Sequence, residues 1–307
     1  MKSTGESTKE QEESTNIEVD ALKKHINILS DQSFEGRRTG TRGEAEACRY
    51  LAEQLKLMGI GPAGEQGAYF QSFPIPNVDL KWKGERTVFS YLNNSSGLVG
   101  ENILGLIESK KNNAKYIVIS AHLDHLGTWK GNLYPGANDN ASGVATVLEM
   151  ARILNIKKDK LPCSILIAFW SGEEMGTIGS RFFVRHMQFP AKDILYNINL
   201  DSIGSGNDNN FIYWAKDINV KPEWGFDAKL NNKEFNLKYQ VDVGHSSDHK
   251  AFLEKNIPAL TILAENWLDN NHTPQDTGEG VNYSKMALLG HFLIDQLYSK
   301  KLDEILS

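Results

Sequence analysis

The sequence predicts a single α/β domain of three layers, in which a mostly parallel, mixed sheet lies between two layers of helices. Short apolar runs alternate with amphipathic segments along most of the chain, which is typical of parallel strands joined by crossover helices. The length of 307 residues fits one such domain. The content of 40% apolar and 23% charged residues excludes a wholly disordered or coiled-coil protein.

The beginning of the chain differs from the rest. Residues 1–16 contain no apolar residue except Met1, so they cannot bury enough surface to fold. We therefore expect a flexible polar tail over 1–16 and a catalytic domain over 17–307.

The elements of this domain follow from periodicity. Apolar residues at helical spacing predict amphipathic helices over 19–29, 44–58, 142–154, 177–187, 248–254 and 283–297. Alternating residues predict half-buried strands over 69–74 and 81–91. Continuous apolar runs predict strands buried on both faces over 116–120, 164–170, 194–200 and 259–263.

Charge and hydropathy exclude two classes of partner. The net charge of −6 gives no basic surface for phosphates, so we expect no nucleic-acid partner. The longest dense apolar run, Ile165 to Trp170, is far shorter than the roughly 20 residues of a membrane-spanning helix. We therefore expect no membrane span.

Acidic and histidine side chains follow each of the predicted buried strands. Ligands of open α/β sheets bind just outside the carboxyl ends of the strands, so these side chains are expected to meet at one edge. The candidates are His122 and Asp124, Glu173 and Glu174, Asp201, His272, and Asp139 of the Gly-rich loop PGANDNASG.

Each candidate alone has an ordinary structural explanation. Asp139 can cap the helix that follows it, and Glu173 with Glu174 can form a solvated turn. Together, however, several carboxylates in one cleft repel each other unless cations lie between them. Imidazole and carboxylate without thiolate suit Zn²⁺, or Co²⁺ and Mn²⁺ in its place.

The number of candidates favours two ions. Five ligands exceed the three that a single catalytic zinc usually takes, but fit two ions about 3.5 to 4 Å apart that share a carboxylate. Such a pair acidifies a bridging water, and a neighbouring carboxylate that is not a ligand accepts its proton. Glu173 and Glu174 can supply both kinds of carboxylate. Asp124 can accept the imidazole N–H of His122 if the strand continues that far.

Five ordered motifs carry a resemblance to a known family. AHLDHLG, PGANDNASG, SGEE, NLDSIG and HTPQDT resemble those of co-catalytic zinc aminopeptidases of the bacterial leucyl aminopeptidase type, over about residues 17–301. These are relatives of glutamate carboxypeptidase and glutaminyl cyclase. The resemblance implies a zinc-exopeptidase fold with two zinc ions per chain: His122 and Asp201 on one, Glu174 and His272 on the other, Asp139 bridging, Glu173 as general base and Asp124 orienting His122.

The implied activity is that of an aminopeptidase acting on peptides with a free N-terminus. Carboxypeptidase or glutaminyl cyclase-like activity, and an inactive binding module, remain as alternatives. A carboxypeptidase needs cations for the substrate carboxylate, and Arg181 and Arg185 are predicted to lie on the solvent face of a helix instead. The cyclases resembled use a single zinc, whereas this chain retains both sets of ligands.

Some positions depart from the family pattern or are assigned only to the substrate pocket. Asn271 stands where some relatives place an aromatic hydroxyl, so the oxyanion donor is open. His249 of GHSSDHKAF and Trp267 are assigned to the pocket region, whereas His125 and His245 receive no role. The resemblance and the polar tail together predict an extracytoplasmic protein, periplasmic, secreted or lipid-anchored after removal of a signal, with a cytoplasmic enzyme as the alternative.

Overall fold

The fold is described from a computed structural model. The structure describes residues 15–84, 86–111, 114–215, 236–241, 244–299 and residue 302. Most of the predicted tail, residues 1–14, lies outside this range. Ile17 is buried, and its main-chain N–H donates to His291 Nε2 at 3.2 Å. The folded part is therefore already anchored at Ile17.

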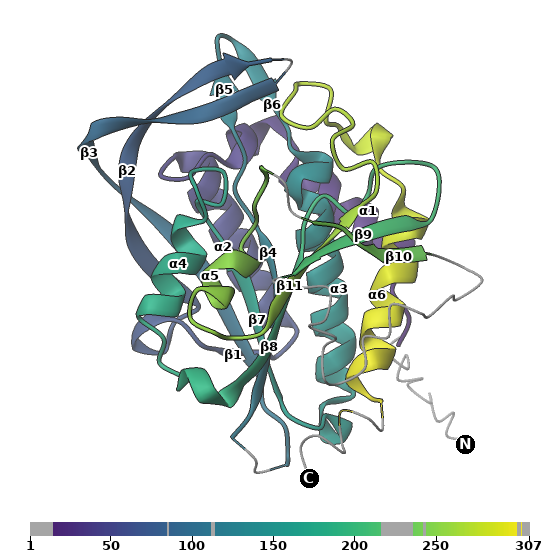
Figure 1. Cartoon of the computed structure of the whole chain (residues 1–307). Helices are drawn as coiled ribbons and strands as arrows, with labels where there is room; N and C mark the ends of the chain where they lie inside the picture. Colours follow the sequence, from purple (N-terminus) through teal and green to yellow (C-terminus); the bar gives the residue numbers. More distant parts are fainter. Residues whose placement is uncertain are drawn as a thin grey trace, which may run out of the picture.

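The centre of the molecule is a mixed sheet of nine strands in the described residues (Figure 1). Its order is β1-β3-β7-β4-β8-β11-β9-β10, with β2 paired to β3 beside this path. The strands are β1 (Gly61–Pro62), β2 (Phe70–Lys83), β3 (Arg86–Ile107), β4 (Tyr116–His122), β7 (Ser164–Trp170), β8 (Ile194–Leu200), β9 (Asn210–Ala215), β10 (Asn236–Tyr239) and β11 (Ala259–Ala264). The core strands β7, β4, β8 and β11 are parallel neighbours, as predicted.

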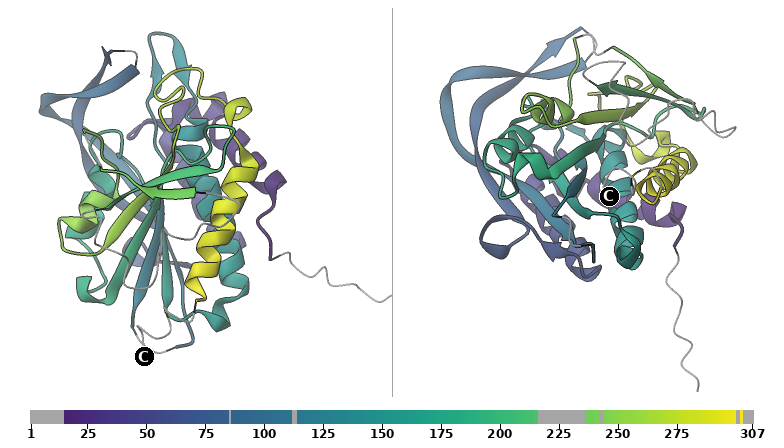
Figure 2. Two further views of the ribbon diagram at one scale, coloured as in Figure 1. Left: turned by 45° about the vertical axis from the view of Figure 1, so that its right-hand side comes forward. Right: turned by 60° about the horizontal axis from the view of Figure 1, so that its bottom comes forward.

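Helices cover both faces of this sheet (Figure 2). One layer contains α1 (Val19–Leu29), α2 (Arg42–Leu57), α3 (Gly143–Ile156) and α6 (Tyr283–Leu297); the other contains α4 (Ile178–Arg185) and α5 (His249–Leu253). Successive strand residues point to opposite faces. Thus Ile117 and Ile119 pack with the first layer and Val118 with the second. The predicted three-layer α/β fold is confirmed.

The largest departure from the prediction is a long hairpin. The two short predicted strands over 69–74 and 81–91 belong to β2 and β3, which pair from Phe70 with Ile103 to Lys83 with Arg86. The register shifts around Pro76, because proline cannot donate to the ladder. The strands β9 and β10, and the small sheet of β5 (Gly127–Trp129) and β6 (Asn132–Tyr134), were also not predicted.

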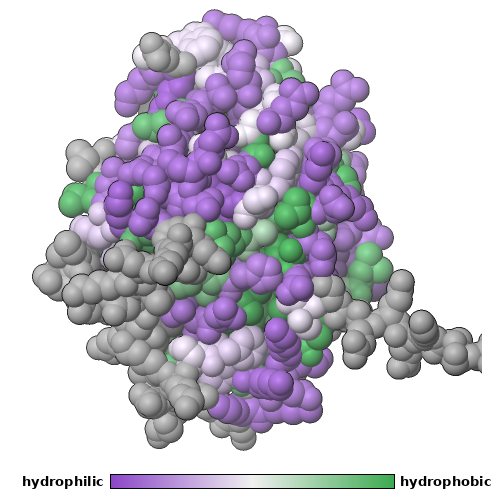
Figure 3. All heavy atoms as spheres, turned by 90° about the vertical axis from the view of Figure 1, so that its right-hand side faces the viewer, coloured by the Kyte–Doolittle hydropathy of each residue, from purple (hydrophilic) through white to green (hydrophobic). Residues whose placement is uncertain are grey.

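One face of the molecular surface is drawn by hydropathy in Figure 3. On the face that Figure 3 shows, hydrophilic residues predominate, and hydrophobic residues gather in small groups between them. None of the described helices combines the length and the apolar character needed to cross a bilayer.

Candidate metal centre and cavity

The loops at the carboxyl ends of the parallel strands bring the predicted ligand residues together. His122 is the last residue of β4, and Asp139 lies in the turn Ala137–Ser142 that leads into α3. Glu174 and Asp201 follow β7 and β8, and His272 lies in the loop beyond β11. These positions follow the rule for ligand sites in open α/β sheets.

The first group of side chains consists of His122, Asp139 and Asp201. His122 Nε2 lies 3.3 Å from Asp201 Oδ1 and 3.3 Å from Asp139 Oδ1. All three residues are buried. Their ligand atoms lie within 4.8 Å of one another, close enough to surround one metal ion.

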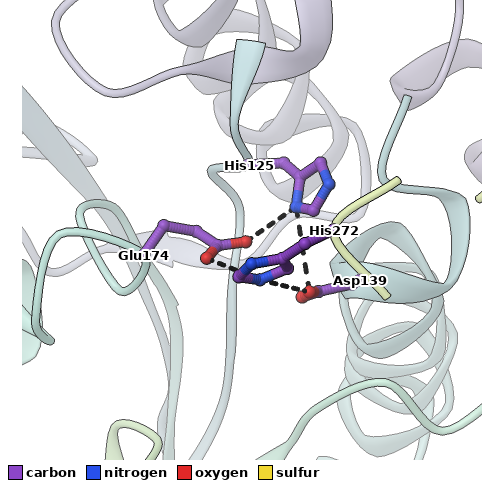
Figure 4. Close-up of side chains that lie close together, drawn as sticks. All are labelled: His125, Asp139, Glu174 and His272. Atoms are coloured by element: carbon purple, nitrogen blue, oxygen red, sulfur yellow. Dashed lines mark hydrogen bonds and ion pairs between the residues drawn. The ribbon is translucent and has the colours of Figure 1, made fainter. Parts of the chain in front are cut away.

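The second group uses the other oxygen of Asp139 (Figure 4). His272 Nε2 lies 3.2 Å from Asp139 Oδ2 and 2.9 Å from Glu174 Oε2. His125 completes the group, with Nδ1 at 2.7 Å from Glu174 Oε1 and 3.9 Å from Asp139 Oδ2. Asp139 therefore belongs to both groups and offers a different oxygen to each.

His125 is the member that sequence reasoning missed. It follows Asp124 directly, after β4 has ended, so the strand periodicity gave no indication of where it points. Glu174 Oε1 can only accept, so His125 Nδ1 carries the hydrogen. His125 Nε2 is buried and has no hydrogen-bond partner among the described residues. His125 thus contacts the oxygen of Glu174 that faces away from His272.

The two predicted histidine ligands share one hydrogen-bonding pattern. His122 Nδ1 lies 3.2 Å from the Asp124 carbonyl oxygen, and His272 Nδ1 lies 2.7 Å from the Thr87 carbonyl oxygen. Carbonyl oxygens only accept, so Nδ1 is the protonated nitrogen of both rings. In the neutral ring, Nε2 then points a lone pair at two carboxylates. That arrangement is repulsive unless a cation lies between them, so the residues fit a pair of divalent metal ions.

The same charges shift the pKa values of the two histidines. Burial alone would lower the pKa of His122, but the Asp201 carboxylate, with Asp124 and Asp139, holds it well above its usual value. Burial is likewise outweighed at His272, where Glu174 and Asp139 raise the pKa. The site therefore attracts positive charge at both Nε2 atoms. Metal ions provide this charge while leaving the imidazoles neutral, as ligation requires.

Asp124 supports the site differently from the prediction. Its carboxylate Oδ1 is 3.7 Å from His122 Nδ1, farther than its own main-chain carbonyl oxygen. The reason is that β4 ends at His122, so Asp124 does not continue the strand alternation. Its carboxylate instead accepts the Glu173 main-chain N–H at 3.1 Å and the Thr39 hydroxyl at 3.0 Å. The expectation that the carboxylate itself holds the imidazole N–H is thus corrected.

Glu173 lines the cavity that opens above the two ligand groups, but it belongs to neither group. Burial, reinforced by the negative charges of Asp201, Asp248 and Glu174, raises its pKa well above the usual value, and His122 opposes the shift. The consecutive acids Glu173 and Glu174 therefore occupy different environments.

Further side chains hold the loop of Asp139. Asp276 accepts the main-chain N–H groups of Asn138 at 2.7 Å and Asp139 at 2.9 Å. Asn271 Nδ2 donates to Asp139 Oδ2 at 2.6 Å. Asp276 belongs to HTPQDT, the motif from which only His272 was assigned, so the motif itself was the signal for it.

A buried arginine joins the loops below the site. Arg37 is 1% exposed, and its guanidinium donates to the carbonyl oxygens of Leu29, Leu123, Pro135 and Gly136. Leu123 directly precedes Asp124, and Gly136 directly precedes the turn that contains Asp139. Burial lowers the pKa of Arg37 to about 10, so the group stays charged at neutral pH.

A cavity of about 240 Å³ opens above the predicted ligands. We call the ligand residues with Glu173 the floor, and the side chains around the opening the wall: Arg86, Val88, Phe89, Trp214, Leu263 and Trp267. Trp267 packs edge-on against Trp214, with ring centres 5.5 Å apart. A larger cavity of about 460 Å³ lies beside β2, and neither ligand group lines it.

Of the two residues assigned to the substrate pocket, one lines the cavity and the other does not. Trp267 lines the cavity. His249 is 1% exposed and lies behind the wall, with Nδ1 2.7 Å from the Thr261 hydroxyl and its ring beside Trp214. Neither Arg181 nor Arg185 lines the cavity, and Arg181 pairs with Glu254.

Comparison with known proteins identifies the family. The family model described as Peptidase family M28 matches residues 102–295, which is more than half of the chain. The chain belongs to peptidase family M28. The matched M28 region includes both ligand groups and Glu173.

Individual relatives show how far the likeness extends. Aminopeptidase YwaD of Bacillus subtilis is 27% identical over 224 residues, which cover 64% of this chain and 44% of the relative. The chain thus spans less than half of that protein. Uncharacterized protein YfbL of Escherichia coli is 29% identical over 220 residues, covering 60% of this chain and 67% of YfbL.

Solved structures share the fold at low identity. BSAP, a zinc aminopeptidase from Bacillus subtilis, superimposes with a TM-score of 0.73 at 18% identity, covering 93% of this chain and 96% of the other. An aminopeptidase from Aneurinibacillus sp. strain AM-1 gives a TM-score of 0.71 at 18% identity, covering 92% and 94%.

Proposed function

We propose that the protein is a metallo-aminopeptidase that binds two zinc ions and releases N-terminal residues from peptides. The observation that carries this proposal is that Asp139 offers one carboxylate oxygen to each of two histidine–carboxylate groups. The names of YwaD and BSAP, both aminopeptidases, support it.

In this proposal His122 and Asp201 hold one ion, Glu174 and His272 the other, and Asp139 both. His125 is a positioning residue, since its Nδ1–H fixes the Glu174 oxygen that is not turned to His272. When bound, two such ions acidify a water held between them and polarise the scissile carbonyl.

Glu173 is the proposed general base. It takes a proton from the attacking water, whose oxygen becomes bonded to the carbonyl carbon. As the C–N bond breaks, Glu173 gives the proton to the leaving amine, so that one water is consumed for each bond cleaved. Its position in the cavity beside both ligand groups, without belonging to either, suits a group that exchanges protons with a water there. Asp124 positions Glu173 through the main-chain N–H that its carboxylate accepts.

The wall indicates the kind of residue that is released. Trp214, Leu263 and Trp267 form an apolar side of the cavity, which favours an apolar or aromatic side chain at the N-terminus of the substrate. The volume of about 240 Å³ lies below the 300 to 1,000 Å³ of ordinary ligand pockets. Such a volume fits the end of a peptide better than an extended chain.

The proposal is tested with a panel of aminoacyl p-nitroanilides, each in a free and an N-acetylated form. We expect hydrolysis of the free forms only, fastest for leucyl and phenylalanyl anilides, and its loss on treatment with a chelator. Hydrolysis of the acetylated forms at similar rates would contradict the aminopeptidase assignment. An absence of hydrolysis across the zinc-loaded panel would favour the inactive binding module.

For the compartment we propose an extracytoplasmic location. A protein named Probable lipoprotein aminopeptidase LpqL, from Mycobacterium tuberculosis, is 39% identical over 101 residues, which cover 33% of this chain. Fractionation of the native host with an antibody against the protein tests this. Recovery with the cytoplasmic fraction would contradict it.

A further inference from the structure

We propose that Arg86 recognises a carboxylate on the residue behind the cleaved bond, and that dipeptides are therefore the preferred substrates. This inference rests on the proposed aminopeptidase function and adds the substrate class. A dipeptide carries its carboxylate on the residue that leaves, whereas a longer peptide carries it farther from the cleaved bond.

The hairpin of β2 and β3 places Arg86 at the cavity. The next residue, Thr87, accepts His272 Nδ1–H through its carbonyl oxygen and pairs its own N–H with the His272 carbonyl oxygen at 3.4 Å. The main chain beside Arg86 is thus fixed to a predicted metal ligand. Arg86 itself lines the cavity, together with Glu173 and the floor.

A chain of two hydrogen bonds connects Arg86 to the floor. Arg86 Nη1 donates to Asn271 Oδ1 at 3.0 Å, and Asn271 Nδ2 donates to Asp139 Oδ2 at 2.6 Å. The guanidinium therefore lies one amide side chain away from the carboxylate common to both ligand groups. Arg86 is thus linked to Asp139 through Asn271, and it lines the cavity that opens above the floor.

A comparison with two other arginines shows that the Arg86 guanidinium has N–H donors left to bind a ligand. Arg37 uses its donors on four carbonyl oxygens, and Arg181 pairs with Glu254. Arg86 has five N–H donors, a neutral amide partner and no ion pair within the described ranges. A planar guanidinium with free donors binds a carboxylate through two parallel hydrogen bonds.

The distances fit a carboxylate one residue beyond the cleaved bond. One residue of extended chain spans at most about 3.6 Å, so the carboxylate of a dipeptide stays within a few ångströms of the scissile carbonyl. Two hydrogen bonds of 3.0 and 2.6 Å, joined by the Asn271 amide, lead from Arg86 to Asp139, so the guanidinium lies beyond the floor on the side where a leaving residue could extend. The cavity volume of about 240 Å³ agrees with a substrate of this size. A side-chain carboxylate of aspartate at the same substrate position offers the same chemistry.

The test compares kcat/KM for Leu-Ala, Leu-Ala-amide, Leu-Asp-amide and N-acetyl-Leu-Ala. In the wild-type zinc enzyme, we expect Leu-Ala to exceed its amide by about tenfold or more, with Leu-Asp-amide intermediate between the two. Arg86→Met should lower the value for Leu-Ala about 10- to 100-fold, as for loss of a charged hydrogen bond, and lower the value for Leu-Ala-amide by a clearly smaller factor that reflects the lost contact with Asn271. Arg49→Met, at an exposed arginine of α2 that pairs with Glu46, is the control and should leave all four values unchanged.

The outcomes separate this inference from the function on which it rests. If an active wild-type enzyme cleaves Leu-Ala and its amide equally, or if Arg86→Met lowers both equally, Arg86 only positions Asn271 and the inference is wrong. If N-acetyl-Leu-Ala is cleaved as well as Leu-Ala, the aminopeptidase function itself fails. Zinc content and melting temperature of each variant, compared with wild type, show that the differences arise in the folded, metal-loaded protein.

Discussion

The floor and the wall of the cavity are held in the protein by different kinds of contact. Floor residues such as His122 and Asp139 lie at or just beyond the ends of buried strands. Asp139 is fixed by its main-chain N–H, which donates to Asp276, and by its carboxylate, which accepts from Asn271. On the wall, Arg86 stands at the start of β3 and Trp267 on a loop, both partly exposed, whereas Trp214 and Leu263 are buried residues of β9 and β11. In the proposed mechanism, metal binding and proton transfer therefore depend on loops fixed to the core, whereas substrate choice depends in part on the outer elements.

The largest expected effect of a substitution is on the floor. We expect Glu173→Gln to lower kcat about 10²- to 10⁴-fold, since it removes the proposed general base and keeps the shape of the side chain. Zinc content should remain at the wild-type value, because Glu173 belongs to neither ligand group. Steady-state kinetics with elemental analysis measures both. Normal turnover would mean that another group accepts the proton.

The next effect is on stability rather than on rate. Arg37→Met removes the guanidinium donor from four carbonyl oxygens, of which that of Pro135 is half-buried and that of Gly136 keeps the Ala141 N–H. An unsatisfied buried group costs about 1 to 3 kcal/mol. We therefore expect the free energy of unfolding to fall by about 3 kcal/mol or more in urea titrations. As a control, Arg181→Met removes an ion pair near the surface and should change stability by less than about 1 kcal/mol. Equal effects would show that the floor does not depend on Arg37.

A smaller effect distinguishes the two ligand groups. His125→Leu removes the hydrogen bond to Glu174, and loss of such a contact to a metal ligand typically costs 10- to 100-fold in metal affinity. We expect one of the two zinc ions to bind that much more weakly in competition titrations with a chromophoric chelator. His125→Asn keeps an N–H donor and should retain most of the affinity. If both variants weaken zinc equally, His125 is itself a ligand.

The smallest effect is expected on the wall. Trp267→Ala opens the apolar side of the cavity without touching the floor. We expect KM for phenylalanyl p-nitroanilide to rise about three- to tenfold, with kcat, zinc content and melting temperature nearly unchanged. A loss of kcat similar to that of Glu173→Gln would show that floor and wall are not separable.

The difference between the floor and the wall also explains which parts of the site could be predicted from the sequence. The strands before His122, Glu174 and Asp201 are continuous apolar runs, and their parallel arrangement brings the residues after them to one edge. Position after a strand was therefore enough to bring the floor candidates together. The fold class followed from the same alternation of apolar runs and amphipathic segments.

Contacts between distant segments could not be predicted in this way. The bond between His272 and Thr87 joins residues 185 positions apart through a hairpin whose length the periodicity did not indicate. Arg86 gave no signal beyond its charge, because only that hairpin carries it to the cavity. Asp124 and His125 follow the end of β4, where alternation no longer gives the direction of a side chain.

Crystallography with anomalous scattering on both sides of the zinc absorption edge tests the central claim most directly. The account predicts two zinc peaks, one between His122 and Asp201 and one between Glu174 and His272, with an oxygen of Asp139 bound to each. A single peak in zinc-saturated crystals, or two peaks of which Asp139 contacts only one, would contradict the claim that its carboxylate joins the two groups.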